Sequence, residues 1–147
     1  MARRLIIDTG VLVDAERGRT GFMDVVADDD DVVIAAITVA ELCTGIELAT
    51  ERHRAGRAEF LVKVLETLPV EPYDLATAEA HGRLLAHVHR GGTKRGAHDL
   101  IIAATAVATK RTVLTTDRSA NFQGLPGVEC IVLRPGTPER VVSRKLG

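Results

Sequence analysis

The sequence of 147 residues contains only two cysteines, three phenylalanines, one tyrosine and no tryptophan. Cys43 and Cys130 both lie in apolar stretches, which favours buried free thiols over a disulfide framework. The scarcity of aromatic side chains argues against a platform on which nucleic-acid bases would stack. The formal net charge is −1, so contact with a nucleic acid would have to come from a local basic patch.

Long apolar runs are also missing. The first run, Leu5 to Ile7, follows two arginines but ends at Asp8, which is too early for a signal peptide, and no other run is long enough to cross a membrane. The composition, 46% hydrophobic and 27% charged, is that of an ordinary globular protein. We therefore expect one cytoplasmic domain over residues 1–147.

Short apolar segments alternate with segments of helical periodicity along the chain. Strands are predicted at residues 5–7, 32–37, 69–72, 112–115 and 128–133, and helices at 11–17, 38–49, 55–68, 74–90 and 98–109. This alternation predicts an α/β fold of three layers, α/β/α, around a mostly parallel sheet of roughly five strands. In such a fold, sites form at the carboxyl ends of the strands.

Four acidic residues fall where that edge is expected. Asp8 follows the first strand, Glu41 the second and Asp117 the fourth, and Asp99 begins the helix that leads into the fourth strand. Each acid alone has a structural explanation: a helix cap for Asp8, a capping box of Thr38 with Glu41, a favourable helix dipole for Asp99 and a turn for Asp117. A shared catalytic site is the single hypothesis that explains all four positions together.

A divalent cation would explain why these acids could lie together. No nearby lysine or arginine is an obvious partner for Asp8, and crowded carboxylates raise one another's pKa unless a cation relieves the repulsion. Ligands that are all oxygens suit Mg²⁺ or Mn²⁺ rather than zinc, and the five histidines show no zinc-ligand spacing.

Two groups of residues could contact the phosphates of a nucleic acid. Thr115, Thr116 and Arg118 flank Asp117 and are predicted to steady a phosphate, although Thr115 has the alternative of being ordinary strand. The basic segment 87–95 runs directly into Asp99 and is either a phosphate-binding patch or a helix end followed by a glycine loop. The acidic run at residues 28–31 is expected to be solvated.

Taken in order, these motifs resemble those of the PIN-domain nucleases, and more closely the VapC toxins of bacterial toxin–antitoxin pairs. The resemblance spans nearly the whole chain and is carried by four segments: LIIDTGVLVD at 5–14, ITVAEL at 37–42, DLIIAATA at 99–106, and LTTDR at 114–118 with Asn121 and Phe122. Gly10 departs from the pattern, because such proteins often carry Asn or Ser there.

The resemblance implies a PIN-like domain that cleaves structured cellular RNA of the tRNA or rRNA class with the help of Mg²⁺ or Mn²⁺. Asp8 and Asp99 would be the principal metal ligands, Asp117 a further direct or water-mediated ligand, and Glu41 part of the same acidic site. A homodimer and an antitoxin that blocks the site are also implied.

Other classes fit the sequence less well. A signalling receiver domain would need an acidic pair after the first strand and a lysine after the last, and neither is present. A dinucleotide-binding domain would need a glycine-rich turn after the first strand, which is missing too. The remaining alternative is a non-catalytic RNA-binding or regulatory module of the same fold.

Overall fold

The computed structural model describes residues 2–18 and 26–133 and shows five parallel strands in one sheet. The strand order is β3-β2-β1-β4-β5, and every neighbouring pair is parallel. The strands are β1 (Arg4–Ile7), β2 (Asp31–Ala35), β3 (Val70–Glu71), β4 (Thr112–Thr115) and β5 (Cys130–Val132). The prediction of a five-stranded parallel sheet is confirmed.

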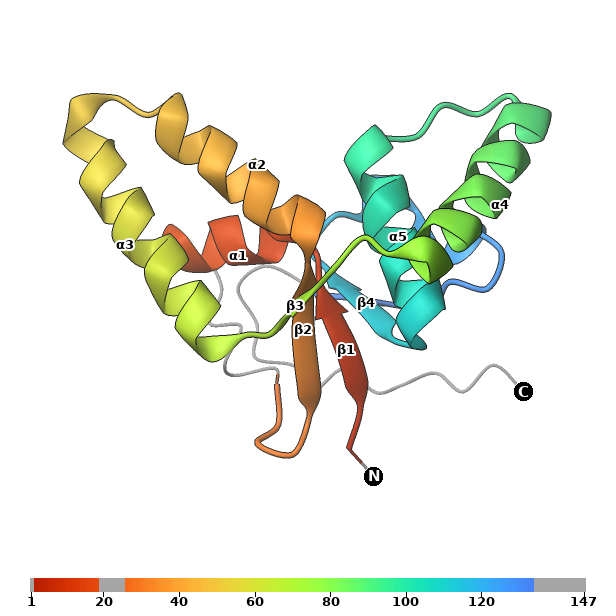
Figure 1. The fold of residues 1–147 in the computed structure, drawn as a ribbon, viewed down its shortest axis with the longest axis horizontal. Helices are drawn as coiled ribbons and strands as arrows, with labels where there is room; N and C mark the ends of the chain where they lie inside the picture. The colour runs from red at the N-terminus through yellow and green to blue at the C-terminus, as the bar shows by residue number, and fades with distance from the viewer. Residues whose placement is uncertain (1, 19–25, 134–147) are drawn as a thin grey trace.

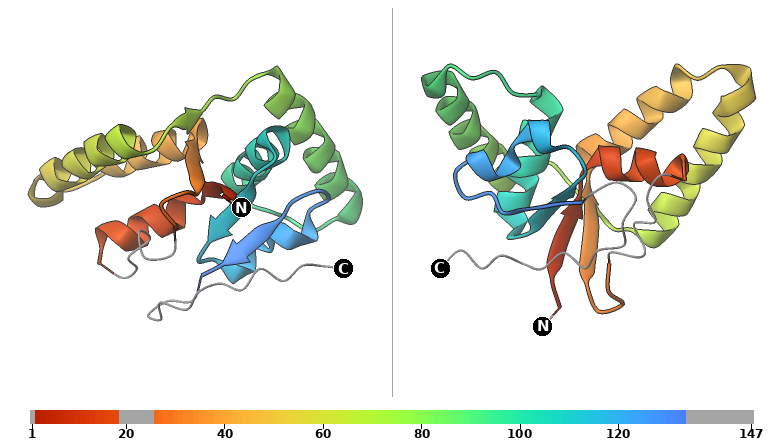
Figure 2. Two further views of the ribbon diagram at one scale, coloured as in Figure 1. Left: turned by 90° about the horizontal axis from the view of Figure 1, so that it is seen from below. Right: turned by 180° about the vertical axis from the view of Figure 1, so that it is seen from behind.

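Helices cover both faces of the sheet and form two arms (Figures 1 and 2). One arm contains the α2–α3 hairpin with α1 beneath it, and the other contains α4 and α5. The helices are α1 (Thr9–Glu16), α2 (Ala36–Glu47), α3 (Glu51–Thr67), α4 (Leu75–Gly91) and α5 (Ala97–Thr109), followed by 3-10 turns η2 (Arg118–Ala120) and η3 (Phe122–Gly124). Within the described ranges, no helix is both long and apolar enough to span a membrane.

Consecutive strand residues point to opposite faces and build two separate cores. Ile6, Val33 and Val113 pack toward α4 and α5. On the other face, Ile7, Ile34 and Leu114 pack with residues of α1, α2 and α3. Burial on both faces explains why the strands are continuously apolar, and it gives the expected three layers.

The start of α2 differs from the prediction. We expected a strand to residue 37, and a capping box of Thr38 with Glu41 was the structural alternative for that acid. The helix already begins at Ala36, however, and its N-cap Ala35 makes no side-chain cap. Thr38 is fully buried inside the helix. The capping-box interpretation of Glu41 is therefore wrong, which leaves its carboxylate available for other contacts.

Arginines organise the amino-terminal edge of the sheet, opposite the predicted site. Arg111, only 8% exposed, pairs with Asp31 at 2.9 Å and with Glu71 at 3.4 Å. Arg3 pairs with Asp30, whose side chain is nearly inaccessible. The expectation that the whole acidic run 28–31 is solvated is thus wrong for Asp30. Asp31 is exposed as expected, although Arg4 and Arg111 pair with it.

Both cysteines are free thiols, as predicted. The structure corrects their placement, however, because Cys43 is exposed on α2 and Cys130 is only partly buried in β5. Cys43 lies on the outer side of an amphipathic helix, and an apolar sequence context alone does not reveal which side that is.

Candidate functional site

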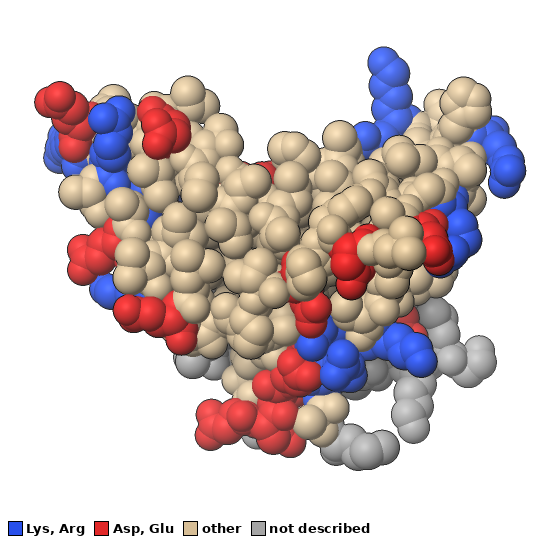
Figure 3. Space-filling view, viewed as in Figure 1, with Lys and Arg blue, Asp and Glu red and all other residues tan. Residues whose placement is uncertain are grey.

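The four predicted acids gather around the carboxyl ends of β1 and β4, between the two helical arms. Asp8 directly follows β1, and Asp117 lies two residues beyond β4. Glu41 comes from the second turn of α2, and Asp99 from the first turn of α5. In the space-filling view a small acidic surface lies at the bottom of the notch between the arms (Figure 3).

Asp8 is the most buried of the four, with 6% of its surface exposed. Burial raises its pKa to about 6, helped by the charges of Asp99 and Glu41 and opposed by a hydrogen bond from Thr115. Its side chain does not cap α1, and no ion pair neutralises it within residues 2–18 and 26–133. A structural role as a helix cap therefore does not account for this buried carboxylate.

Thr115 holds Asp8 in place. Its hydroxyl donates to Asp8 Oδ2 at 2.8 Å and accepts from the backbone N–H of Asp117 at 3.0 Å. Because the side chain is completely buried and its donor is already used, it cannot reach a phosphate. The interpretation of Thr115 as a substrate contact is replaced by a positioning role that links two of the acids.

Asp99 lies half-buried at the start of α5. Burial and the charges of Asp117 and Glu41 raise its pKa. Its carboxylate folds back over Gly96, where a Cβ atom would lie only 2.9 Å from Asp99 Oδ2. Gly96 has an ordinary backbone conformation, with φ −60° and ψ 130°, so the missing side chain matters here rather than backbone freedom.

Glu41 is held by Thr9 and by His98, neither of which was predicted to contact it. Thr9 Oγ1 donates to Glu41 Oε1 at 2.8 Å and lies 3.0 Å from the buried Thr38 Oγ1. His98 Nδ1 lies 3.5 Å from the other carboxylate oxygen of Glu41. The available signal was the placement of two threonines inside otherwise apolar segments, one of them next to Asp8.

Asp117 is exposed and differs from the other acids. Its Oδ1 accepts from the backbone N–H of Ser119 at 2.8 Å and from the Ser119 hydroxyl at 2.5 Å, and these bonds lower its pKa. The predicted turn is thus present, and it coexists with the charge coupling to Asp99.

The two other predicted phosphate contacts lie near Asp117. Thr116 donates to Asp14 at 3.1 Å, and Arg118 is exposed. A Cβ at Gly10 would lie 3.7 Å from Thr116 Oγ1, an ordinary van der Waals contact. A larger residue at position 10, such as the Asn or Ser that related proteins often carry, would therefore contact Thr116. Gly10 leaves this contact out.

The basic segment 87–95 divides into two parts. Arg95 donates to the carbonyl oxygens of Ala120 at 2.9 Å and Asn121 at 2.6 Å, and so ties the loop before Asp99 to the segment after Asp117. His89 and Arg90 lie in the last turn of α4, which ends at Gly92 with φ 68°. The helix-end interpretation describes these residues, whereas Arg95 serves to join the loops that carry two acids.

The donor chemistry of the site fits a hard divalent cation. The donors are all carboxylate oxygens, and burial and mutual repulsion raise the pKa values of Asp8 and Asp99. Within the described ranges, no three Asp, Glu, His or Cys side chains lie close enough to form a ready ligand group. The acids therefore interact through their charges without forming a finished coordination sphere.

The chain is similar to a known family over most of its length. The PIN-domain model matches residues 5–124. Ribonuclease VapC5 of Mycobacterium tuberculosis is 35% identical over 130 residues, covering 86% of this chain and 93% of that protein. Ribonuclease VapC of Rickettsia bellii is 25% identical over 130 residues, covering 88% and 96%. The chain therefore belongs to the PIN-domain family and, within it, to the VapC ribonucleases.

Solved structures agree with this assignment. The toxin–antitoxin structure VapBC-5 of M. tuberculosis contains a chain with 28% identity and a TM-score of 0.73, with 88% of this chain and 98% of that one covered. VapBC2 of Rickettsia felis, bound to a DNA fragment of its promoter, gives a TM-score of 0.80 at 20% identity, covering 88% and 98%. The second likeness shows the shared fold alone.

Proposed function

We propose that this chain is a divalent-metal-dependent endoribonuclease and the toxin of a toxin–antitoxin pair. The observation that carries the proposal is the coupling of Asp8, Glu41 and Asp99 at one edge of the sheet, where burial and like charge raise the pKa of Asp8 to about 6. Buried, unneutralised carboxylates are costly unless a cation or a proton compensates them. Membership of the VapC ribonucleases supports the same conclusion.

Asp8 and Asp99 would hold the cation, with Asp117 as a further ligand through Oδ2, since Ser119 occupies Oδ1. A bound Mg²⁺ or Mn²⁺ supplies charge neutralisation at a phosphodiester and lowers the pKa of a water molecule. Thr115 fixes Asp8, and Thr9 fixes Oε1 of Glu41. Glu41 Oε2, which lies 3.5 Å from His98 Nδ1, would accept a proton from the attacking water, and the products would carry 5′-phosphate and 3′-hydroxyl ends.

The finer predictions concern the target and the partners. A relative named tRNA(fMet)-specific endonuclease VapC, from Salmonella typhimurium, is 34% identical over 97 residues, or 65% of this chain and 70% of that protein. This supports a structured RNA of the tRNA or rRNA class as the target. The toxin–antitoxin structure VapBC-5, which contains a chain of 28% identity, supports an antitoxin partner. A homodimer, contact of Thr116 and Arg118 with phosphate, and a cytoplasmic location stay predictions.

The test is cleavage of RNA by the purified chain. Total bacterial RNA is incubated with the protein in Mg²⁺, in Mn²⁺ or in chelator, beside an Asp99→Asn variant whose fold is checked by circular dichroism. We expect discrete fragments with 5′-phosphate ends in either metal, none in chelator, and at least a hundredfold loss in the variant. Cleavage that persists in chelator or in the folded variant would contradict the proposal. A folded wild type without activity on any RNA would instead favour the non-catalytic module.

A further inference from the structure

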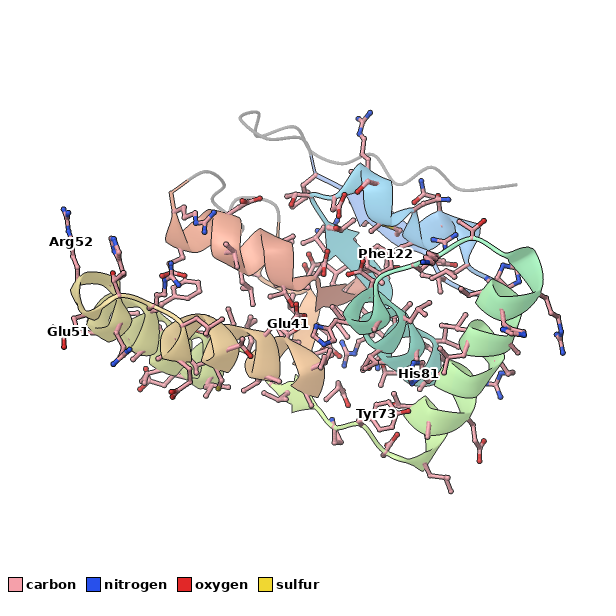
Figure 4. All side chains as sticks on the ribbon, turned by 90° about the horizontal axis from the view of Figure 1, so that it is seen from above. Glu41, Glu51, Arg52, Tyr73, His81 and Phe122 are labelled. Atoms are coloured by element: carbon pink, nitrogen blue, oxygen red, sulfur yellow. The ribbon has the colours of Figure 1, made fainter. Side chains whose placement is uncertain are left out.

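A cleft of about 660 Å³ opens beside the acids and runs away from them between α1 and the α2–α3 hairpin. Thr9 and Glu41 line its inner end. Arg52 and His53, at the start of α3, line its outer end. Figure 4 shows this separation: Glu41 lies near the centre of the molecule, and Arg52 lies at the tip of the hairpin. The cleft therefore connects the catalytic acids with the outer end of one arm.

Basic side chains outnumber acidic ones along this cleft. Arg17, Arg52 and Arg57 line it together with His53, and the acids on its walls are Glu16 and Glu41. Glu41 already belongs to the catalytic cluster, so the part beyond the site carries a net positive charge. Because the overall charge is −1, contact with a nucleic acid requires a local basic patch, and this part of the cleft provides one.

The most enclosed of these cations is fixed in place. Arg57 is partly buried and donates through Nη1 to the carbonyl oxygen of Gly45 at 2.9 Å, across the hairpin. A guanidinium group carries five N–H donors, so most of them stay available to a ligand in the cleft. Because this hydrogen bond already restricts the Arg57 side chain, binding a ligand would cost less side-chain entropy.

The walls also leave room for a ligand. Gly45 and Gly56 lie inside α2 and α3 and line the cleft, although glycine costs a helix about 1 kcal/mol relative to alanine. A Cβ at Gly56 would meet no atom within 4 Å. Phe60, partly buried on α3, adds an aromatic side chain to the lining. An open basic cleft with a single aromatic suits a sugar–phosphate backbone better than a row of stacked bases.

We propose that this cleft binds the RNA strand next to the scissile phosphodiester, with Arg52 and Arg57 contacting its phosphates. The inference rests on the proposed ribonuclease function and assigns the path of the substrate on one side of the acids. A strand cut at the acids must continue past them, and the cleft begins at Glu41 itself. Phosphate contacts of this kind set affinity and its dependence on salt.

The experiment measures the affinity for RNA as a function of salt concentration. A fluorescently labelled single-stranded RNA of mixed sequence is titrated with protein in chelator, so that no cleavage occurs. The proteins are wild type, Arg52→Gln with Arg57→Gln, the charge-retaining Arg52→Lys with Arg57→Lys, and Lys63→Gln. Lys63 is the matched control, because it also lies on α3 but is 70% exposed, pairs with Glu59 and does not line the cleft.

The logarithm of the association constant for RNA falls linearly with the logarithm of the salt concentration. Each lost phosphate contact should reduce the magnitude of this slope by about 0.7. We expect a reduction of about 1.4 for the double Gln variant, and wild-type slopes for the double Lys variant and for Lys63→Gln. For the single Arg52→Gln variant, the magnitude of the slope should fall by about 0.7. Arg52 is exposed, so this result does not depend on the hydrogen bond between Arg57 and Gly45. Equal slopes for the wild type and the double Gln variant would overturn the proposal and leave the cleft to a protein partner such as the antitoxin.

Cleavage of RNA by the wild type in Mg²⁺ is measured in parallel. If RNA is cleaved but the slopes coincide, the ribonuclease stands and the assignment of the cleft fails. If the slopes differ as expected but no RNA is cleaved, the cleft binds RNA and the catalytic proposal fails. The two proposals are thus tested separately.

Discussion

At the scale of single residues, the four acids differ in their electrostatic environment. Asp8 and Asp99 have raised pKa values because they are buried beside other carboxylates, whereas hydrogen bonds from Ser119 lower the pKa of Asp117. The two raised acids gain most from a cation, and Asp117 is ionised without one. This difference is the reason for assigning Asp8 and Asp99 as the principal ligands and Asp117 as an additional one.

Replacing Thr115 tests its positioning role. Thr115→Val removes the hydroxyl that donates to Asp8 and accepts from Asp117 N–H. We expect the free energy of unfolding to fall by about 1–2 kcal/mol and kcat/KM for RNA cleavage to fall roughly tenfold to a hundredfold. In the wild type this hydrogen bond lowers the pKa of Asp8, so its loss should raise that pKa. The acidic limb of the pH profile of cleavage should therefore move to higher pH. Thr115→Ser should restore the wild-type profile; a valine variant with that same profile would refute the role.

Gly96→Ala tests the space in which Asp99 lies. The new Cβ would lie 2.9 Å from Asp99 Oδ2, so the short carboxylate must rotate away while the backbone stays as it is. We expect activity to fall at least tenfold, with a thermal midpoint equal to or above that of the wild type, since alanine reduces the entropy of the unfolded chain. Activity assays and thermal unfolding together separate this effect from misfolding.

The matched control is Gly82→Ala in α4, where an added Cβ would meet no atom within 4 Å. That change should stabilise the helix by up to about 1 kcal/mol and leave cleavage unchanged. If Gly96→Ala and Gly82→Ala were equally active, the position of the Asp99 carboxylate would not depend on Gly96.

The sequence predicted where the four acids lie, but it did not predict which residues orient them. A polar residue at the end of an apolar strand is visible in a sequence, so Asp8, Asp99 and Asp117 could be located from strand and helix positions. The roles of Thr9, Thr115 and Gly96 depend on which side chains meet across elements that are distant in the sequence. Thr115 lies 107 residues from its partner Asp8, and no local pattern encodes that contact.

At the scale of the elements, Arg111 connects strands at the edge opposite the acids. Its guanidinium group bonds to Asp31 and Glu71 and to the carbonyl oxygen of Asp31, so β2 and β3 are held at the start of β4. The sequence placed this arginine immediately before a strand, but it did not reveal that the side chain is buried.

We expect Arg111→Met to lower the free energy of unfolding by about 1–3 kcal/mol, because the partly buried Glu71 loses its cation and the hydrogen bonds of the buried guanidinium group to β2 are lost. Cleavage per folded molecule should be unchanged, since the residue lies at the other edge of the sheet. Urea unfolding and activity measurements check both statements. Arg4→Gln provides the comparison: its pair with Asp31 is exposed on both sides and should contribute less to stability than the buried Arg111 does. An Arg111→Met protein as stable as the wild type would show that the cluster does not hold the strands.

Element types were easier to predict than element boundaries. Asp74 caps α4 through the N–H of Thr77 at 3.0 Å, and Gly92 ends it in a left-handed conformation; both signals are local to the sequence. The start of α2 was placed two residues too late, because the apolar run 32–37 continues from a strand into a partly buried helix turn without a break. Periodicity cannot separate these two states over so few residues.

At the scale of the whole molecule, the site exists only because the sheet and both arms come together. Glu41 comes from the α2–α3 arm, Asp99 from the α4–α5 arm, and Asp8 and Asp117 from the edge of the sheet between them. Folding therefore brings together carboxylates that repel one another. The stability of the metal-free protein should show the cost of that repulsion.

The pH dependence of stability follows from the sign of the Asp8 shift. The pKa of Asp8 is about 6 in the folded state, against an ordinary value of 3.8, so the folded state favours the protonated form. Protonation of Asp8 therefore stabilises the folded state. This contribution is complete below pH ~4 and is lost as the pH rises through about 6, which lowers the free energy of unfolding by about 3 kcal/mol. The raised pKa of Asp99 acts in the same direction. A divalent cation should recover this loss by binding the ionised acids.

The most direct test is the free energy of unfolding between pH 4 and 7.5, with chelator or with Mg²⁺, for the wild type and Asp8→Asn. We predict that the wild type in chelator loses about 3 kcal/mol relative to Asp8→Asn as the pH rises, and that Mg²⁺ restores most of this loss in the wild type but not in the variant. A wild type whose stability relative to Asp8→Asn is independent of both pH and Mg²⁺ would contradict the account of these carboxylates as one cation-binding site.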